Sequence, residues 1–346
     1  MPILPKSFIR SLPPKSAKGR AALLAALSLL LLAALLFSLR TGSRGYSFPA
    51  LFAALLSSDE QDVIRRVLVH VRIPRTLACA LAGAALAAAG ALTQAVLHNA
   101  MASPNIIGVN AGAGFFSLLL SLLLPGVSRA AAMGAFLGAL GTALLIYALA
   151  LRAGLSRTTL ILAGVAISSI LNAATNAVTL LFPDIAIGSA GFMVGGFSGV
   201  NLAALQNAAP YLIAGFLLAA LLAVELDILQ LGEQSAASLG LHVARTRFLA
   251  ILSAALLAGA AVSFAGLLGF VGLLAPHAAR RLIGGSNVLL LPACSLLGAA
   301  FVLLCDALSR ALFSPYELPV GIVLSLLGGP FFLFLLLRQR RRQADD

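Results

Sequence analysis

The sequence predicts an all-α, polytopic membrane protein with about ten transmembrane helices, and two observations lead to this fold class. Of the 346 residues, 61% are hydrophobic and only 10% are charged, whereas soluble globular proteins carry about 25% charged residues. Unbroken apolar runs such as AALLAALSLLLLAALLF (21–37) fill most of the chain. Such runs exclude a transmembrane barrel, whose strands alternate over about ten residues. Helices are then the elements that satisfy their backbone hydrogen bonds in lipid.

Ten apolar segments have the length and composition expected of membrane-spanning helices. The eighth is short and contains Pro276, and glycine and alanine dilute the third and the ninth. The predicted spans are 21–39, 74–97, 106–125, 130–151, 158–182, 207–229, 247–267, 269–283, 290–312 and 319–337.

The charged termini predict the orientation, because basic residues concentrate on the cytoplasmic side of a membrane. Residues 1–20 form a basic N-terminus, 21–337 form the ten-span transmembrane domain, and 338–346 form a C-terminal tail that begins with four arginines among five residues. Both ends are therefore predicted to be cytoplasmic, which requires an even number of spans. The expected location is the bacterial cytoplasmic (inner) membrane.

The stretch RRVLVHVRIPR (65–75) breaks this rule. With ten spans, Arg65, Arg66, Arg72 and Arg75 lie outside the cytoplasm, although most of the 23 basic residues lie inside. Four arginines on this side need a reason other than topology.

The net charge of +12 does not indicate a nucleic-acid partner, because the basic residues lie in short segments between apolar runs. That distribution fits topology and contact with anionic membrane lipid. Cys79, Cys294 and Cys305 lie in apolar runs without metal or disulfide spacing, so we interpret them as small buried side chains. Neither a metal site nor a cofactor is expected.

Small residues recur at helical spacing in two of the predicted spans. Lipid provides no hydrophobic drive for helix association, so small residues that let backbones approach closely mark packing faces. The two sets are Gly83, Ala87 and Gly90, and Gly134, Gly138 and Gly141.

The fifth span carries a polar stripe. Its members follow the spacing i, i+4, i+7, i+11, with one asparagine beside them, and so share one helix face. Two interpretations are open: hydrogen-bonding contacts between helices, or the wetted wall of a pathway for a large polar substrate. Thr93 and Gln94, near the inner end of the second span, are candidates for the same wall. The stripe comprises Ser168, Asn172, Thr175, Asn176 and Thr179.

The source of energy for transport is not encoded in this chain. The span centres carry no convincing ionisable site for ion coupling, and the sequence has no phosphate loop of the form GxxxxGK[ST]. Asp306 and Arg310 lie one turn apart near the outer end of the ninth span, with Glu317 shortly after, and can pair with one another. The chain is therefore interpreted as a non-enzymatic subunit; if transport is active, its energy comes from another polypeptide.

A cytoplasmic segment between the sixth and seventh spans, LGEQSAASLGLHVARTRF (231–248), is more than a connector. It favours helix up to Gly240, a residue suited to a helix C-terminus, and resumes at His242. We expect two short helices around the glycine, within 231–245, that form a compact cytoplasmic surface. Its Glu-Ala-Ala-to-Gly pattern resembles that of permeases of ATP-binding-cassette (ABC) importers, in which coupling helices insert into a groove of the ATPase. The residues concerned are Glu233, Ala236, Ala237, Gly240 and Leu241.

An ordered series of motifs over roughly residues 60–337 resembles the FecCD type of permease, the ten-span importers of ferric siderophores, haem and cobalamin. The series departs from the family at Asn99-Ala100-Met101-Ala102, where the usual motif is Asn-Pro-Leu-Ala. The matching segments are RIPR (72–75), LAGAALAAAGALTQ (81–94), HNAMASPNIIGVNAGAG (98–114), LILAGVAIS (160–168), MVGGFSGV (193–200), LGEQSAASLGL (231–241), GLLGFVGLLAPHAARRLIG (266–284), LLPACSLLGAAFVLLCDALSR (290–310) and ELPVGIVLSLLGGPFF (317–332).

This resemblance implies a type II ABC importer permease architecture. It implies a homodimer, or a pair with a close paralogue, with one pathway at the interface lined largely by the fifth and tenth spans. It also implies an ABC ATPase homodimer on the cytoplasmic side and an extracytoplasmic substrate-binding protein, periplasmic or lipoprotein, on the other. Acidic residues of that binding protein are expected to dock on Arg72, Arg75 and Arg310.

The expected function is translocation of an iron complex, ferric siderophore or haem, delivered by the binding protein and driven by ATP hydrolysis on partner subunits. Cobalamin is the alternative within the class. An ion-coupled secondary transporter is the alternative from another class, and it would work without an ATPase. A structural scaffold fits poorly because it has no need of a polar intramembrane stripe.

Overall fold

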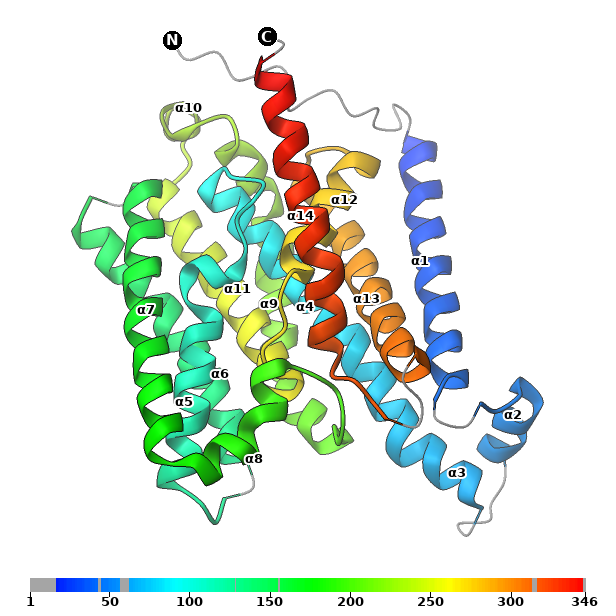
Figure 1. Cartoon of the computed structure of the whole chain (residues 1–346). Helices are drawn as coiled ribbons and strands as arrows, with labels where there is room; N and C mark the ends of the chain where they lie inside the picture. Colours follow the sequence, from blue (N-terminus) through cyan, green and yellow to red (C-terminus); the bar gives the residue numbers. More distant parts are fainter. Residues whose placement is uncertain are drawn as a thin grey trace.

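The computed structural model describes residues 17–42, 45–56, 62–127, 129–154, 156–312 and 316–344. Over these ranges the chain is all-helical (Figure 1), which confirms the predicted fold class. Most of the basic N-terminus, and Asp345 and Asp346 of the tail, lie outside the described residues.

Each of the ten predicted spans coincides with a helix. Seven of the described helices are long and apolar enough to cross a membrane, and α5 and the apolar part of α14, Val320–Phe334, are shorter. The helix α12 has only 13 residues and contains Pro276, so a count of ten crossings stays a prediction. The helices at the ten positions are α1 (Ala17–Arg40), α4 (Ile73–Leu97), α5 (Val109–Leu123), α6 (Ala130–Arg152), α7 (Arg157–Leu181), α9 (Leu202–Leu229), α11 (Val243–Ala265), α12 (Val271–Ile283), α13 (Asn287–Leu312) and α14 (Val320–Ala344).

Six further elements lie between these helices. Five of them were not predicted, whereas the helix at Glu233–Ser238 is the first of the two short helices expected around Gly240. All six are short, so they lack the long apolar pattern by which a span is recognised. They are α2 (Phe48–Leu56), α3 (Val63–Val67), the π-helical turn η2 (Leu68–Arg72), the 3₁₀ turn η3 (Pro104–Ile107), α8 (Pro183–Val194) and α10 (Glu233–Ser238).

The helix α4 forms the centre of the core and packs against α11, α12 and α13. Its glycines allow this close approach: a Cβ on Gly90 would lie 1.9 Å from the backbone oxygen of Gly272, and one on Gly83 would lie 2.3 Å from that of Gly298. Ala87 is fully buried on the same helix. The predicted packing face of α4 is confirmed.

The packing face predicted on α6 is confirmed at two of its three glycines. Gly134 and Gly138 lie against the backbone of α5, whereas a Cβ on Gly141 would meet no atom within 4 Å. The expectation for Gly141 was therefore wrong: its spacing of seven residues keeps it close to the helix face of Gly134, but no other helix of the described chain packs on it there.

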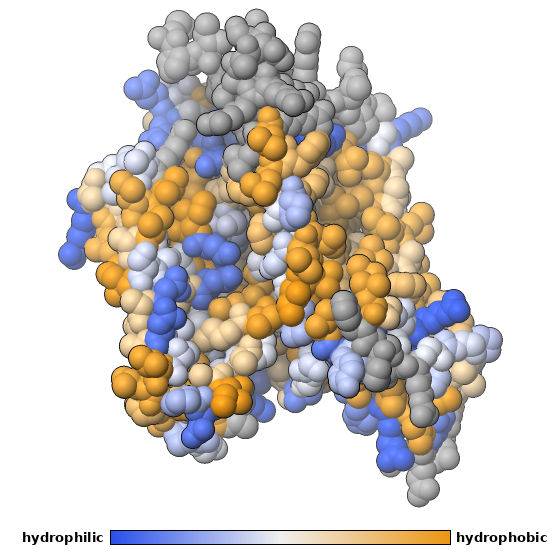
Figure 2. Space-filling model, viewed as in Figure 1, coloured by the Kyte–Doolittle hydropathy of each residue, from blue (hydrophilic) through white to orange (hydrophobic). Residues whose placement is uncertain are grey.

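The ends of the helices separate into two sets. The start of α1, the helix α10 and the end of α14 lie at one end of the molecule, and α2, α3 and α8 lie at the other (Figure 1). We call these the inner and outer ends, following the predicted orientation. Apolar residues cover much of the flanks between them, and hydrophilic residues interrupt that surface along α7 and beside it (Figure 2).

A break between α11 and α12 leaves residues 266–270 outside any helix. Gly266 and Phe270 both have positive φ, of 70° and 64°. The backbone of this segment is hydrogen-bonded to the end of α8: the Leu267 N–H donates to the Phe192 oxygen over 2.9 Å. Irregular backbone at membrane depth is tolerated where protein buries it or where it lines a cavity.

Candidate functional site

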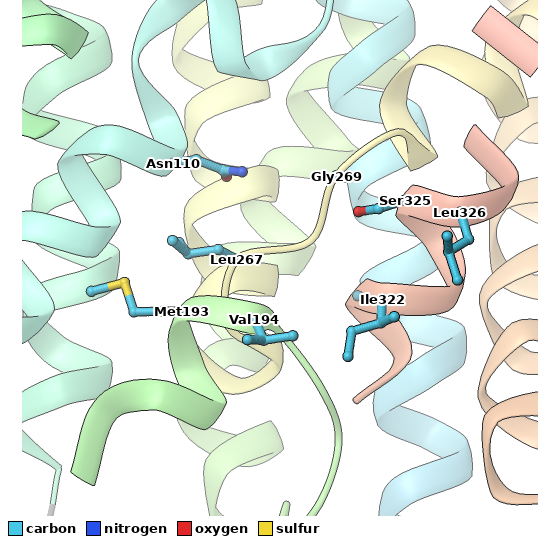
Figure 3. Close-up of a pocket in the computed structure, with 9 residues that line it drawn as sticks. Asn110, Met193, Val194, Leu267, Gly269, Ile322, Ser325 and Leu326 are labelled. Atoms are coloured by element: carbon cyan, nitrogen blue, oxygen red, sulfur yellow. The ribbon is translucent and has the colours of Figure 1, made fainter. Parts of the chain in front are cut away.

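An open cleft of about 630 Å³ lies where four segments meet. The start of α5, the end of α8, the 266–270 segment and the first turns of α14 supply its walls (Figure 3). A Cβ on Gly321 would lie 1.9 Å from the Val194 oxygen, so only glycine lets the start of α14 contact the end of α8 here. The lining residues are Asn110, Met193, Val194, Leu267, Gly269, Gly321, Ile322, Ser325 and Leu326.

The wall of the cleft is neutral. Its lining includes two polar side chains, Asn110 and Ser325, and no charged one. The Asn110 amide is directed toward the Leu268 oxygen, at 3.5 Å. A wall of this kind offers hydrogen bonds but no ionic trap, so it suits passage of a bulky ligand more than its retention.

Sequence reasoning did not find this cleft. Its residues come from a broken helix, two helix starts and one helix end, and none of those segments shows a polar stripe. The positive φ of Gly195 and Gly266 and the glycine-rich motifs around them were the available signal, because such glycines mark places where backbones approach each other.

The polar stripe lies on the most exposed of the long apolar helices. Only 6% of the residues in the apolar window of α7 are buried. Asn172 and Asn176 are exposed, whereas Thr175 and Thr179 are partly buried. The two threonine hydroxyls donate to backbone oxygens of their own helix, over 2.8 and 2.9 Å.

None of the stripe residues lines the cleft. The fifth member, Ser168, is partly buried, and its hydroxyl would lie 3.6 Å from a Cβ on Gly108. Thr93 and Gln94, the other candidates for that wall, are buried inside α4. Gln94 accepts a hydrogen bond from Arg280 over 3.0 Å, so these two side chains serve the core rather than the stripe.

The outer end holds a cluster of four charged side chains. Arg75 donates to both oxygens of Asp306, with Nη2 at 3.0 Å, and Arg310 Nε donates to Asp306 Oδ2 over 2.9 Å. Arg75 Nη1 also donates to Glu317 over 2.6 Å. The Asp306 side chain is fully buried, and that of Glu317 is 37% exposed. The two cations and two anions of this cluster balance. Asp306 pairs with Arg310, as expected from the sequence, whereas Glu317 pairs with Arg75 rather than with Arg310.

Arg72 and Arg310 meet the end of α1. Arg72 Nη1 donates to the Leu39 and Arg40 oxygens over 2.7 and 3.1 Å. Arg310 donates to the Ser38 oxygen, over 3.3 Å from Nη2, and to that of Thr41. Cations are favourable at the C-terminus of a helix, where carbonyl groups lack intrahelical partners. The three arginines assigned to docking are therefore 4–8% exposed and hold internal contacts.

At the inner end, α10 is short and stands out from the bundle (Figure 1). It ends as expected at Gly240, whose φ is 85°. The Gly240 N–H donates to the Ala237 oxygen and the Leu241 N–H to that of Ala236, over 2.9 and 3.0 Å. This is the Schellman arrangement, which needs a left-handed residue at the glycine position.

The helix α10 is bound to the inner end of α11, which in turn is hydrogen-bonded to α9. Ala236 is buried, whereas Ala237 and Gly240 are exposed. Glu233 forms an ion pair with Arg247 of α11 over 2.5 Å, and the neighbouring Thr246 donates to Glu225 of α9 over 2.6 Å. The second short helix expected after Gly240 is absent from the described chain here, because the residues from Val243 onward form the first turns of α11.

The loop that departs from Asn-Pro-Leu-Ala is held by its asparagine. The Asn99 side chain accepts from the Met101 N–H over 2.9 Å, and its backbone oxygen accepts from the Ala102 N–H over 3.1 Å. His98 adopts a left-handed φ of 46° and lies 2.8 Å from the Leu229 oxygen. A tight turn therefore forms here without the proline.

An all-helical membrane protein with a neutral cleft beside a broken helix, and with a short helix exposed at one end, has the parts that a transport permease needs. The chain belongs to the FecCD transport family, whose model matches residues 30–338. This finding confirms the resemblance read from the sequence motifs.

Individual relatives agree with the family over most of the chain. The Fe(3+)-citrate import system permease protein YfmE of Bacillus subtilis is 35% identical, over 92% of this chain and 95% of its own. The hemin transport system permease protein HmuU of Yersinia pestis is 34% identical, over 85% of this chain and 90% of its own. The cobalamin import system permease protein BtuC of Halobacterium salinarum is 37% identical, over 87% of this chain and 82% of its own.

A solved structure shares the fold. It shows a metal-chelate type ABC transporter in an inward-facing conformation, and it matches with a TM-score of 0.81 at 29% sequence identity. The match covers 92% of this chain and 99% of the other. The chain is thus a permease of the ABC importer class, a transport subunit of the membrane.

Proposed function

We propose that this chain is the membrane-spanning subunit of an ATP-driven importer for an iron complex, a ferric siderophore or haem. The family match over residues 30–338 carries the proposal, and relatives named for Fe(3+)-citrate and hemin support the substrate class. Cobalamin is the second candidate, because a cobalamin permease is 37% identical to the chain.

The translocation pathway is proposed to run past the cleft and the face of α7 that carries the polar stripe. Both surfaces are uncharged, and both are open in the single chain. A second copy of the chain, or a close paralogue, would close the pathway from the other side. The substrate-binding protein then selects the cargo, because a neutral wall discriminates weakly between bulky complexes.

The ATPase partner is proposed to dock on α10. Exposed Leu239, beside Gly240, and exposed Leu231 give the inner surface an apolar component, as an interface with another subunit requires. Movement of α10 would reach α11 through the Glu233–Arg247 ion pair, and α11 ends at the broken segment that lines the cleft. The helix α11 thus connects the proposed ATPase docking surface on α10 with the cleft. Both termini of the chain are on the cytoplasmic side in this arrangement.

When the binding protein docks at the outer end, one of its carboxylates is proposed to replace the carboxylate of Glu317 at Arg75. The cluster around Arg75 is already neutral, so it offers an incoming acidic residue no net positive charge. Asp306 is fully buried between two arginines and cannot leave, whereas Glu317 is 37% exposed. An acidic residue of the binding protein would therefore take the place of Glu317 at Arg75, in a bidentate or single contact of the kind arginine favours.

Charge reversal tests the docking part of the proposal. Arg72→Glu together with Arg75→Glu should weaken the association of the binding protein, and reversal of acidic residues on that protein should restore it. Glu317→Gln should have the opposite effect and speed association, because it removes the internal competitor. Unchanged docking in the reversed permease contradicts docking at these arginines, and so does a loss that no partner mutation repairs in a variant whose thermal unfolding matches that of the wild type.

Parallel uptake measurements test the substrate. Cells that depend on this permease should accumulate a labelled ferric siderophore or haem in preference to labelled cobalamin. The matched control is the same strain carrying the Gly240→Val variant, which keeps the cleft but alters α10. Uptake of cobalamin alone would favour the second candidate and overturn the first.

A further inference from the structure

The helix α2 is apolar on every side. Its nine residues, FPALFAALL, include no charged or hydrogen-bonding side chain. A helix that is apolar all round is buried in protein or in a membrane. At roughly 1.5 Å per residue a nine-residue helix is far too short to span a bilayer. Something apolar must therefore cover whichever face the protein itself leaves open.

One face of α2 packs on the protein and the other does not. Leu51 is 6% and Ala54 2% exposed, on the side that contacts α3 and η2. The opposite side presents four large side chains at the spacing i, i+4, i+7, i+8, which places them on one helix face. These are Phe48, Phe52, Leu55 and Leu56, with exposed fractions of 46%, 65%, 54% and 70%.

The place of α2 in the fold puts this face at the depth of the membrane. The 24 residues of α1 cover about 36 Å, enough to cross the hydrocarbon core with a little to spare. The helix α2 begins eight residues after the end of α1, at the outer end, and lies no further out than the end of α7 (Figure 1). Exposed Phe37 and Leu36 of α1 continue the apolar surface at that end.

The entrance to α2 has the chemistry of a membrane interface. The Arg40 guanidinium carbon lies 5.8 Å from the centre of the Phe48 ring, and that of Arg72 lies 4.6 Å from the Tyr46 ring. Aromatic rings and arginines concentrate at headgroup level, where the ring is partly in lipid and the cation remains hydrated. The helix therefore passes from a polar, aromatic edge into a purely apolar face.

We propose that α2 is an interfacial helix whose exposed face, Phe48, Phe52, Leu55 and Leu56, rests against the acyl chains of the outer leaflet. The occupant is lipid rather than the soluble binding protein, because none of the nine residues of α2 carries a polar side chain and the helix lies at the depth of the outer end of α7 (Figure 1). Such a helix anchors the outer loop between α1 and α4 to the membrane surface.

The absence of tryptophan from the sequence makes a direct test available. Phe52→Trp introduces a single fluorophore at an exposed position, where it does not disturb the core. The purified full-length permease is reconstituted in nanodiscs of phosphatidylcholine, with and without bromine on the acyl chains. Two reference variants carry their single tryptophan at Leu29, 66% exposed in the middle of α1, and at Gln234, exposed on α10.

Bromolipid should quench Phe52→Trp to an extent comparable with Leu29→Trp, and aqueous iodide should quench it far less than Gln234→Trp. Quenching of Phe52→Trp by iodide but not by bromolipid would place α2 in water and overturn the proposal. Protection from both quenchers would mean that protein, such as a second copy of the chain, covers the helix, and that result would overturn it as well. None of these outcomes depends on the transported substrate.

Discussion

Substitution of Asp306 by asparagine tests how the outer end of the fold is held together. The carboxylate is fully buried and joins Arg75 of α4 to Arg310 of α13, which in turn holds the end of α1. Removing one partner of a buried ion pair leaves an uncompensated charge and costs about 3–5 kcal/mol. Here one change removes the carboxylate partner of Arg310 and leaves Arg75 with Glu317 alone, so the upper part of that range is expected.

Glu317→Gln is the matched control in the same cluster. Glu317 contacts the same arginine, but its side chain is 37% exposed, and an ion pair open to solvent contributes about 0–1 kcal/mol. The contrast between the two variants therefore follows from burial and from the number of arginines paired, which is two for Asp306 and one for Glu317.

Unfolding of the purified permease in detergent, followed by the helical circular dichroism signal on heating, measures the difference. Asp306→Asn should lower the unfolding midpoint by on the order of 5–10 °C, and Glu317→Gln by no more than about 2 °C. Wild-type stability of Asp306→Asn, or equal losses in the two variants, would refute the assignment of this cluster as the clamp between α1, α4 and α13.

Three further predictions follow from the geometry. Gly240→Val should abolish the ATP hydrolysis that the loaded binding protein stimulates, while the permease still assembles, and Gly240→Asn should retain much of that hydrolysis. No atom lies within 4 Å of the missing Cβ. The left-handed backbone alone therefore sets the cost of a side chain here, about 1–2 kcal/mol. Gly90→Ala should destabilise the bundle by about 1–3 kcal/mol, whereas Gly141→Ala, with open space around it, should be neutral or stabilising in the same thermal assay. In a background without native cysteines, Asn172→Cys should react with polar thiol reagents faster than Leu171→Cys, and equal rates would contradict a one-sided wet face.

Much of the fold was predictable because helices in lipid must be long and apolar. The positions of α1, α4 and α13 followed from composition alone, and the close packing of Gly83 and Gly90 followed from their spacing. The helix stop at Gly240 was equally local, because one residue with a positive φ decides it. Periodicity and turn chemistry act within a few residues, so the sequence displays them directly.

The features that the sequence did not reveal depend on contacts between distant segments. The cleft forms where Asn110, Met193 and Ser325 meet, and these residues belong to three helices whose patterns give no sign of their meeting. The burial of Arg72 was also hidden, because its partners are backbone carbonyls of α1 that carry no sequence signature. The sequence alone does not distinguish an arginine that binds a partner protein at the outer end from one that donates to the carbonyl groups at the end of a helix.

Reconstitution of transport tests the central claim most directly. The permease is placed in proteoliposomes alone, with its ATPase, and with both the ATPase and the binding protein loaded with a labelled ferric siderophore or haem. An ABC importer permease predicts uptake only in the complete system, and only with ATP that can be hydrolysed; an imposed proton or sodium gradient should not replace it. Uptake by the permease alone, driven by such a gradient, would contradict the account and identify an ion-coupled transporter instead.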